Sequence, residues 1–237
     1  LAFARYMVTS TTMSIANKMA LRVVGTPLLL VGIQSLAVLI LLIPAYKTIR
    51  LGSSQDRIRW LPVSVLFIAM LVASMISYKY CSLGTLVIIH MGAPIMAIIV
   101  ESAFSSTFQG DIHTFLSLAV IAAGVVTYAY YQKSVGKNEM LGVIAALVNM
   151  AIGTTEHVAQ RILLVETKGF GMSDTGIMLY NSVVSCLGAL ILSIPFGEMH
   201  TLSSQIADKP IEPVDYGYIA LSCLCAPCIG YMAIRAQ

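Results

Sequence analysis

Residues Asp174 to Pro195 read DTGIMLYNSVVSCLGALILSIP, which is about the length of apolar helix that crosses a bilayer. A polar patch, Tyr180-Asn181-Ser182, lies near the start of this segment, and Ser185 follows one turn later. An Asn amide that faced lipid would lack hydrogen-bond partners, which costs free energy in hydrocarbon. Asn181 is therefore expected either to bond with neighbouring helices or to face a water-accessible cavity. We interpret it as facing a polar ligand.

The composition is that of a membrane protein. Of the 237 residues, 58% are hydrophobic and 11% are charged, whereas a soluble domain carries about 25% charged residues. The formal net charge is +3, and the basic residues lie between apolar segments instead of forming one patch. This distribution argues against nucleic acid as a partner. We therefore expect a chain that crosses the membrane several times.

Apolar runs of roughly one bilayer thickness predict an all-α membrane protein. The predicted membrane helices cover residues 3–21, 28–46, 60–79, 83–104, 113–131, 140–158, 175–196 and 215–235. Aromatic residues near the ends of these segments, Trp60 among them, are expected at the membrane interface. The longest links, residues 47–59, 159–174 and 197–214, are predicted to be loops. The links leave no room for a separate soluble domain.

The basic residues predict which way the chain is inserted. The link at residues 47–59 carries Lys47, Arg50, Arg57 and Arg59. Because cytosolic loops carry an excess of Lys and Arg, this link and the N-terminus are expected on the cytosolic side. The acidic link around Glu198 would then face the lumen or the exterior.

The chain contains an internal repeat. Residues 36–44 read LAVLILLIP and residues 187–195 read LGALILSIP, with six of nine positions identical. The segments before them also align, since Asn17-Lys18 and Glu156-His157 each lie at the end of a predicted helix and precede a basic residue. The first and second helices then correspond to the sixth and seventh. The repeating unit has five helices, and an odd number inserts the second copy in the opposite orientation.

The predicted fold is therefore a helical bundle of inverted five-helix repeats. Residues 1–132 would form the first repeat, and residues 139–237 the second repeat, truncated after its third helix. A full plan of this kind has about ten spans, of which about eight fit this chain, so the chain is expected to end two helices short. A polar substrate site is expected at the midplane, between the two repeats.

These residues resemble a known family. The chain resembles nucleotide-sugar transporters of the drug/metabolite transporter superfamily, in the branch shared with plastid triose-phosphate translocators. Asn17-Lys18 resembles the Asn-Lys pair of that branch. Leu179-Tyr180-Asn181-Ser182 resembles the Phe-Tyr-Asn-Asn motif of GDP-mannose transporters at two of four positions. Residues 84–104 resemble the family's fourth helix, where His90 and Glu101 take the places of a basic and an acidic residue.

The resemblance and the depth of the polar residues together predict a site. The expected substrate-binding residues are Tyr180, Asn181, Ser182, His90, Lys18, Asn17 and Asn149, and the expected gating residues are Glu101, Glu156 and His157. A protonated imidazole at His90 would supply positive charge to a diphosphate, or a neutral one would bridge two helices. Lys18 would neutralise substrate or extend to the membrane interface. Asn149 would bind substrate or pack between helices.

The resemblance implies a secondary antiporter that exchanges a nucleotide-sugar for a nucleoside monophosphate across the Golgi or ER membrane by alternating access. Its partners would be these small molecules and membrane lipid, and a homodimer is left open. No cofactor is expected. The alternatives are a sugar-phosphate/phosphate antiporter of the plastid type, which would need several Lys and Arg residues in its cavity, and a non-transporting membrane scaffold.

No catalytic motif was found in the sequence. The four histidines fall on different predicted elements and lack the His-Glu-x-x-His spacing of a zinc site. The chain also lacks a Gly-x-Ser-x-Gly elbow and a Walker loop. We therefore expect neither an enzyme nor a metal site. An intramembrane enzyme would need paired ionisable groups at one depth.

Overall fold

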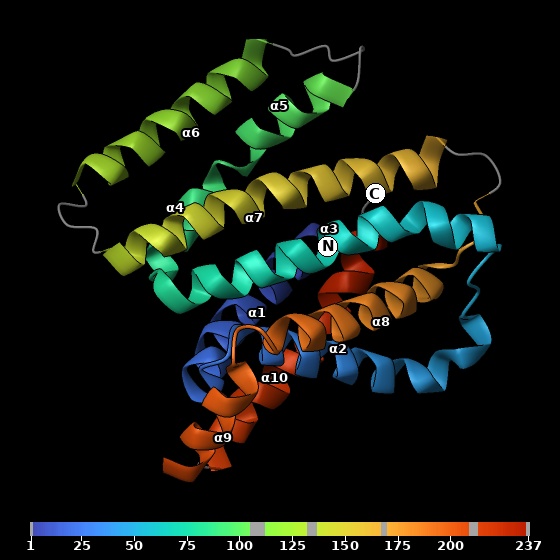
Figure 1. Ribbon diagram of the computed structural model, residues 1–237. Coiled ribbons are helices and arrows are strands. Elements are labelled where there is room, and N and C mark those ends of the chain that lie inside the picture. Colours follow the sequence, from blue (N-terminus) through green and yellow to red (C-terminus); the bar gives the residue numbers. More distant parts are fainter. Residues whose placement is uncertain (1, 105–111, 132–136, 167–169, 209–212, 236–237) are drawn as a thin grey trace.

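The computed structural model is a bundle of α-helices (Figure 1) and describes residues 2–104, 112–131, 137–166, 170–208 and 213–235. The prediction of an all-α protein is confirmed. The helices are α1 (Ala2–Val24), α2 (Pro27–Leu42), α3 (Ser54–Tyr80), α4 (Leu83–Met91), α5 (Ala93–Phe104), α6 (Ile112–Tyr131), α7 (Lys137–Arg161), α8 (Asp174–Ser193), α9 (Glu198–Asp208) and α10 (Pro213–Arg235). A 3-10 turn (Ile43–Thr48) follows α2, and a π-helical turn (Ile162–Glu166) follows α7.

Short polar side chains fix where several helices begin. At the start of α3, the hydroxyl of Ser53 accepts from the N–H of Asp56, and the carboxylate of Asp56 accepts from the N–H of Ser53. This capping box satisfies two backbone donors that the first turn leaves unpaired. Ser82 and Ser173 cap α4 and α8 through their hydroxyls. Pro27 occupies the first turn of α2, where a missing N–H has no cost.

Five helical segments among the described residues are long and apolar enough to cross a membrane. They are Pro27–Thr48, Ser54–Tyr80, Leu83–Val100, Glu139–Leu164 and Asp174–Ser193. Large apolar side chains are exposed along these helices, for example Leu36 and Ile40 on α2 and Leu187 and Ile191 on α8. Exposed apolar surface of this extent is unusual in a soluble protein but is expected where helices face lipid. The protein is a multi-pass membrane protein.

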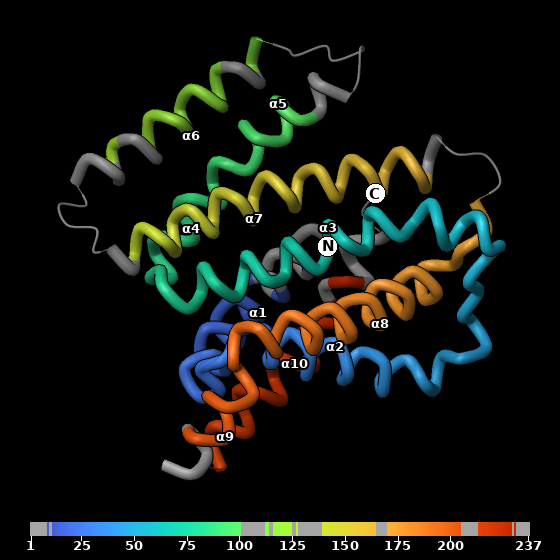
Figure 2. Tube along the Cα trace, in the orientation of Figure 1, coloured from blue at the N-terminus to red at the C-terminus, as the bar shows by residue number. Residues whose placement is uncertain are grey.

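The structure corrects two sequence predictions. The segment predicted as one helix at residues 83–104 is divided into α4 and α5 at Gly92, where the chain bends (Figure 2). Pro94 explains the break, because proline has no N–H to continue the hydrogen-bond ladder. The link at residues 197–214 was predicted to be a loop, yet it contains α9. This helix is short and polar, so it gives no apolar run in the sequence.

Three helix pairs form the centre of the bundle: α3 packs on α7, α2 packs on α8, and α1 packs on α10. The helices α5 and α6 lie on the outer side of α7, away from α2 and α8 (Figure 1). One buried apolar cluster includes Leu30, Val31 and Met75, and a second includes Trp60 and Ile177. Residues from all six central helices also surround a cavity.

Candidate functional site

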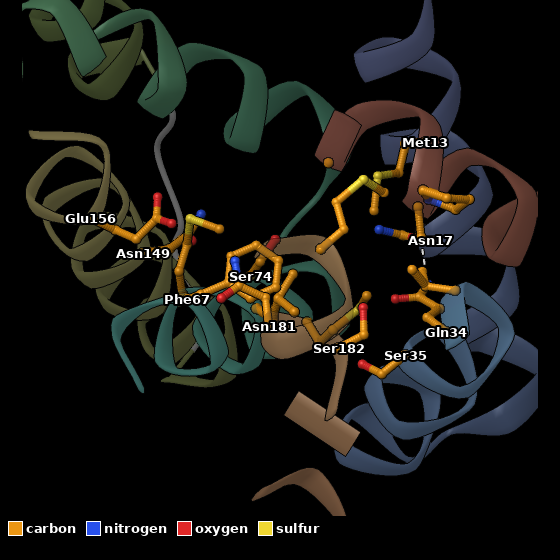
Figure 3. A pocket seen from close by; sticks show the side chains of 18 of the residues that line it. Met13, Asn17, Gln34, Ser35, Phe67, Ser74, Asn149, Glu156, Asn181 and Ser182 are labelled. Atoms are coloured by element: carbon orange, nitrogen blue, oxygen red, sulfur yellow. Dashed lines mark hydrogen bonds between the residues drawn. The ribbon is translucent and has the colours of Figure 1, made fainter. Parts of the chain in front are cut away.

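A cavity of about 260 Å³ lies between α1, α2, α3, α7, α8 and α10. Figure 3 shows the side chains that point toward it. Its apolar wall includes Met13, Phe67, Met70 and Met178. Its polar lining includes Ser14, Asn17, Gln34, Ser35, Ser74, Asn149, Glu156, His157, Gln160, Asn181 and Ser182. Among the described lining residues, the ionisable side chains other than Tyr78 are those of Glu156 and His157.

Asn181 connects the cavity to α3. The side-chain oxygen of Asn181 accepts a hydrogen bond from the indole N–H of Trp60 (2.9 Å) and a second from the hydroxyl of Ser64 (2.6 Å). An indole nitrogen can only donate, so the oxygen of Asn181 must face Trp60. The amide nitrogen, with its two N–H donors, has no hydrogen-bond partner within the described part of the chain. Asn181 thus bonds to a neighbouring helix and also lines the cavity.

A second polar group joins α1, α2 and α10. The side-chain oxygen of Asn17 accepts hydrogen bonds from the amide of Gln34 (2.8 Å) and from the hydroxyl of Ser222 (2.7 Å). Gln34 also donates to Ser222. All three side chains are buried. Asn17 and Gln34 line the cavity on the side away from Glu156 (Figure 3).

A third polar group lies on α7, where Gln160 donates a hydrogen bond to Oε1 of Glu156. The other carboxylate oxygen, Oε2, lies 3.3 Å from Nδ1 of His157. Glu156 is fully buried, whereas the side chain of His157 is 51% exposed. Asn149 lies two turns earlier on the same helix face. The cavity therefore has a carboxylate at one side and neutral amides and hydroxyls elsewhere.

The structure brings six of the predicted site residues to the cavity: Asn17, Asn149, Glu156, His157, Asn181 and Ser182. Three others do not line it. Lys18 donates to the backbone carbonyls of Tyr78 (2.5 Å) and Cys81 at the end of α3. His90 is exposed on α4, and Tyr180 packs against the apolar cluster around Trp60. The side chain of the tenth residue, Glu101, lies outside the described part. Their roles remain predictions.

Several cavity residues were not predicted from the sequence. Gln34 and Gln160 are polar residues within apolar helices, the signal that was used for Asn149, and both could have been found in this way. Phe67 and Met70 give no such signal, because they are ordinary apolar residues of a membrane helix. Trp60 was expected at the membrane interface, but its side chain faces the interior of the protein. It is 0% exposed, because its N–H bonds to Asn181 and its ring contacts Phe170 at 5.5 Å between centroids.

Two segments meet at one end of the bundle (Figure 1), and we call residues 48–52 and 171–176 the clasp. The backbone N–H of Ser173 donates to the carbonyl of Arg50 (2.9 Å), and the backbone N–H of Arg50 donates to the hydroxyl of Ser173 (2.9 Å). Leu51 and Met172 form an antiparallel bridge. Gly52 has a φ of 61°, which favours glycine. The clasp joins the first half of the chain to the second.

The structure thus defines a class of protein: a multi-pass helical membrane protein with a partly open cavity, lined by apolar and polar side chains, between its central helices. No family model matches the chain. It is 24% identical over 241 residues to GDP-fucose transporter 1 of Arabidopsis thaliana, covering 98% of this chain and 68% of that protein. It is 25% identical over 214 residues to GDP-mannose transporter GONST3 of the same plant, covering 87% of this chain and 55% of that protein.

These matches extend over most of the chain, so they include the cavity-lining helices as well as the surrounding ones. The chain is distantly similar to these two nucleotide-sugar transporters. The resemblance seen in the sequence is confirmed at this level. Both relatives are named as transporters.

Proposed function

We propose that this protein is a secondary antiporter that moves a nucleotide-sugar across an endomembrane, of the Golgi or the ER, in exchange for a nucleoside monophosphate. The observation that carries the proposal is the cavity, whose lining combines buried amides and hydroxyls with apolar side chains. Such groups bind the hydroxyls and base edges of a nucleotide-sugar. The names of the two relatives favour GDP-sugars as the substrates.

The pairing of the helices supports two opposed repeats at residues 1–132 and 139–237. In this scheme α1, α2 and α3 correspond to α7, α8 and α10. The packing of α3 on α7 then matches that of α10 on α1, and the packing of α3 on α8 matches that of α10 on α2. The remaining central pair is α2 with α8, and in this scheme these two helices correspond to each other. A site enclosed by both repeats suits a transporter in which one half moves against the other.

The clasp supports alternating access as the mechanism. Residues 48–52 belong to the first proposed repeat and residues 171–176 to the second, so their hydrogen bonds hold the two repeats together at one end. In the proposed orientation this end is cytosolic. The described conformation would then be closed to the cytosol, and these hydrogen bonds would break when the cavity opens to that side.

The test is exchange by the full protein in liposomes loaded with GMP, with radiolabelled GDP-mannose and GDP-fucose outside. We expect uptake that requires internal GMP. Asn181→Leu, which removes the amide at nearly constant volume, should abolish uptake. Ser203→Ala, on exposed α9, is the control and should transport as the unmodified protein does. Folded protein that takes up no nucleotide-sugar would contradict the proposal.

The plastid-type alternative predicts several basic residues around the substrate. The described lining residues include no Lys or Arg, so no observation favours this alternative. Uptake of a triose phosphate against inorganic phosphate in the same liposomes would support it.

A further inference from the structure

Three buried oxygens on α7 lack a hydrogen-bond donor among the described residues. They are Oδ1 of Asn149, Oε2 of Glu156 and Oε1 of Gln160. The exposed fractions of these residues are 8%, 0% and 4%, and all three line the cavity. A buried acceptor without a donor costs about 1–3 kcal/mol, so native proteins nearly always satisfy such groups. A cluster of three such oxygens, on residues that line the cavity, is what a ligand that brings donors would satisfy.

The neighbouring bonds fix these atoms as acceptors. Gln160 uses its amide nitrogen to donate to Glu156, which leaves its oxygen free. Asn149 directs its amide nitrogen to Nε2 of His90 (3.4 Å), and Nδ1 of His90 lies 2.7 Å from the carbonyl of Leu86. Nδ1 therefore carries the proton and Nε2 accepts. Nδ1 of His157 lies 3.3 Å from Oε2 of Glu156, but without hydrogen-bond geometry.

The wall beside these acceptors is apolar. Phe67 lies on the same side of the cavity as Asn149 and Glu156, whereas Asn17 and Gln34 lie on the other side (Figure 3). The sulfur of Met70 lies near Gly153, between Asn149 and Glu156 along α7. An aromatic ring and a thioether offer a stacking surface to a flat ring. The acceptors and this surface together suit a nucleobase.

Among the four common bases, guanine matches a carboxylate best. Its N1–H and its 2-amino group are neighbouring donors that one carboxylate can accept together. Uracil has a single N–H between two carbonyls, and adenine and cytosine each have an amino group next to a ring acceptor. A carboxylate also repels phosphate, so Glu156 belongs at an end of the ligand distant from the diphosphate.

We propose that Glu156 reads the guanine edge of the substrate, accepting hydrogen bonds from N1–H and the 2-amino group, with Asn149 and Gln160 beside it and Phe67 stacked on the base. This inference rests on the proposed function, since it takes the ligand to be a nucleotide. It adds the residue that selects guanine over other bases.

The test measures dissociation constants of GMP, IMP, XMP and GDP-mannose for the full purified protein and two variants. IMP lacks the 2-amino group, so the unmodified protein should bind it about tenfold to hundredfold more weakly than GMP. Glu156→Gln offers one acceptor and one donor. This variant should bind GMP more weakly by a similar factor. It should bind XMP, whose 2-oxo group accepts a hydrogen bond, more tightly than it binds GMP. Thr155→Ala changes a neighbour that bonds to its own helix and should match the unmodified protein.

Three outcomes would overturn the inference. Equal binding of GMP and IMP by the unmodified protein would do so without any variant, and would leave the proposed function intact because GMP still binds. An unchanged preference for GMP over IMP in Glu156→Gln, with weaker binding of the GDP-sugar, would assign the carboxylate to the sugar instead. Failure of the unmodified protein to bind any nucleotide would remove the proposed function and this inference together.

Discussion

Gly176 is the position at which one added methyl group should open the clasp. A Cβ there would lie 2.1 Å from the carbonyl oxygen of Arg50, whereas non-bonded heavy atoms pack at about 3.5 Å. The carbonyl must therefore move by more than about 1 Å in Gly176→Ala. The same carbonyl accepts from the N–H of Ser173, so the movement separates the two segments of the clasp.

The cost follows from the hydrogen bonds that would break. Besides the two between Arg50 and Ser173, the hydroxyls of Ser173 (2.9 Å) and Thr175 (3.0 Å) donate to the carbonyl of Thr48. Four bonds at a net 0.5–1.5 kcal/mol each contribute about 2–6 kcal/mol. Alanine in a helix recovers about 1 kcal/mol relative to glycine. The clasp should therefore lose about 1–5 kcal/mol of free energy.

Hydrogen–deuterium exchange measures this loss directly. The amides of residues 48–52 and 171–176 should exchange at least about fivefold faster in Gly176→Ala, since each 1.4 kcal/mol is a factor of ten. Gly217→Ala is the matched control, because that glycine is also helical and its added Cβ has nothing within 4 Å. Equal exchange in Gly176→Ala and in the unmodified protein would show that these bonds do not hold the two halves of the chain together.

Three further substitutions test separate contacts. Asn17→Ala removes the acceptor of two buried hydrogen bonds and should lower Tm by about 2–12 °C in thermal unfolding, from a loss of about 1–3 kcal/mol; an unchanged Tm would count against the bonds. Lys18→Met should lower Tm but keep the stabilisation by added GMP, and the reverse result would assign Lys18 to the substrate. Burial raises the pKa of Glu198 above 4.5, although the N–H groups of Leu29 and Leu28 and the charge of Lys79 oppose the rise. The native state therefore binds this proton more tightly than the unfolded state does, and the resulting stability is present below pH 4.5 and is lost as pH rises through the native pKa. Glu198→Gln should lose less stability than the unmodified protein over that interval, and parallel stability curves would contradict this.

The helices were predictable because the bilayer leaves an apolar chain few choices. A run of about 20 apolar residues must satisfy its backbone within itself, which a helix does. The break at Gly92 and the helix α9 depend on other forces. The first follows from the missing N–H of one proline. In the second, the carboxylate of Glu198 accepts from the N–H groups of Leu28 and Leu29 at the start of α2 (2.9 and 3.0 Å), a contact between distant parts of the sequence.

The same reasoning explains which site residues the sequence located. Asn17, Asn149 and Asn181 line the cavity, because an amide at membrane depth must find other polar groups. Lys18 immediately follows Asn17, but a step of one residue turns the side chain by about 100° around the helix. It therefore bonds to the end of α3. Packing decides where a polar side chain points and which group it bonds to. The pattern of polar residues along the sequence does not reveal that packing. The residues of the apolar wall, such as Phe67, leave no mark in the sequence at all.

Trp60 provides a physical route between the cavity and the clasp. It lies one turn after Asp56 on α3. Asp56 forms the capping box of that helix with Ser53, which directly follows the clasp residue Gly52. The ring of Trp60 contacts Phe170, which directly precedes the clasp residue Gly171. Its N–H bonds to Asn181 in the cavity wall. Because this side chain is wholly buried and interiors are close-packed, a ligand that draws Asn181 away must displace either the indole or its hydrogen bond. Occupation of the proposed substrate site and opening of the clasp would then be coupled through one side chain, which is the coupling that exchange without leakage requires.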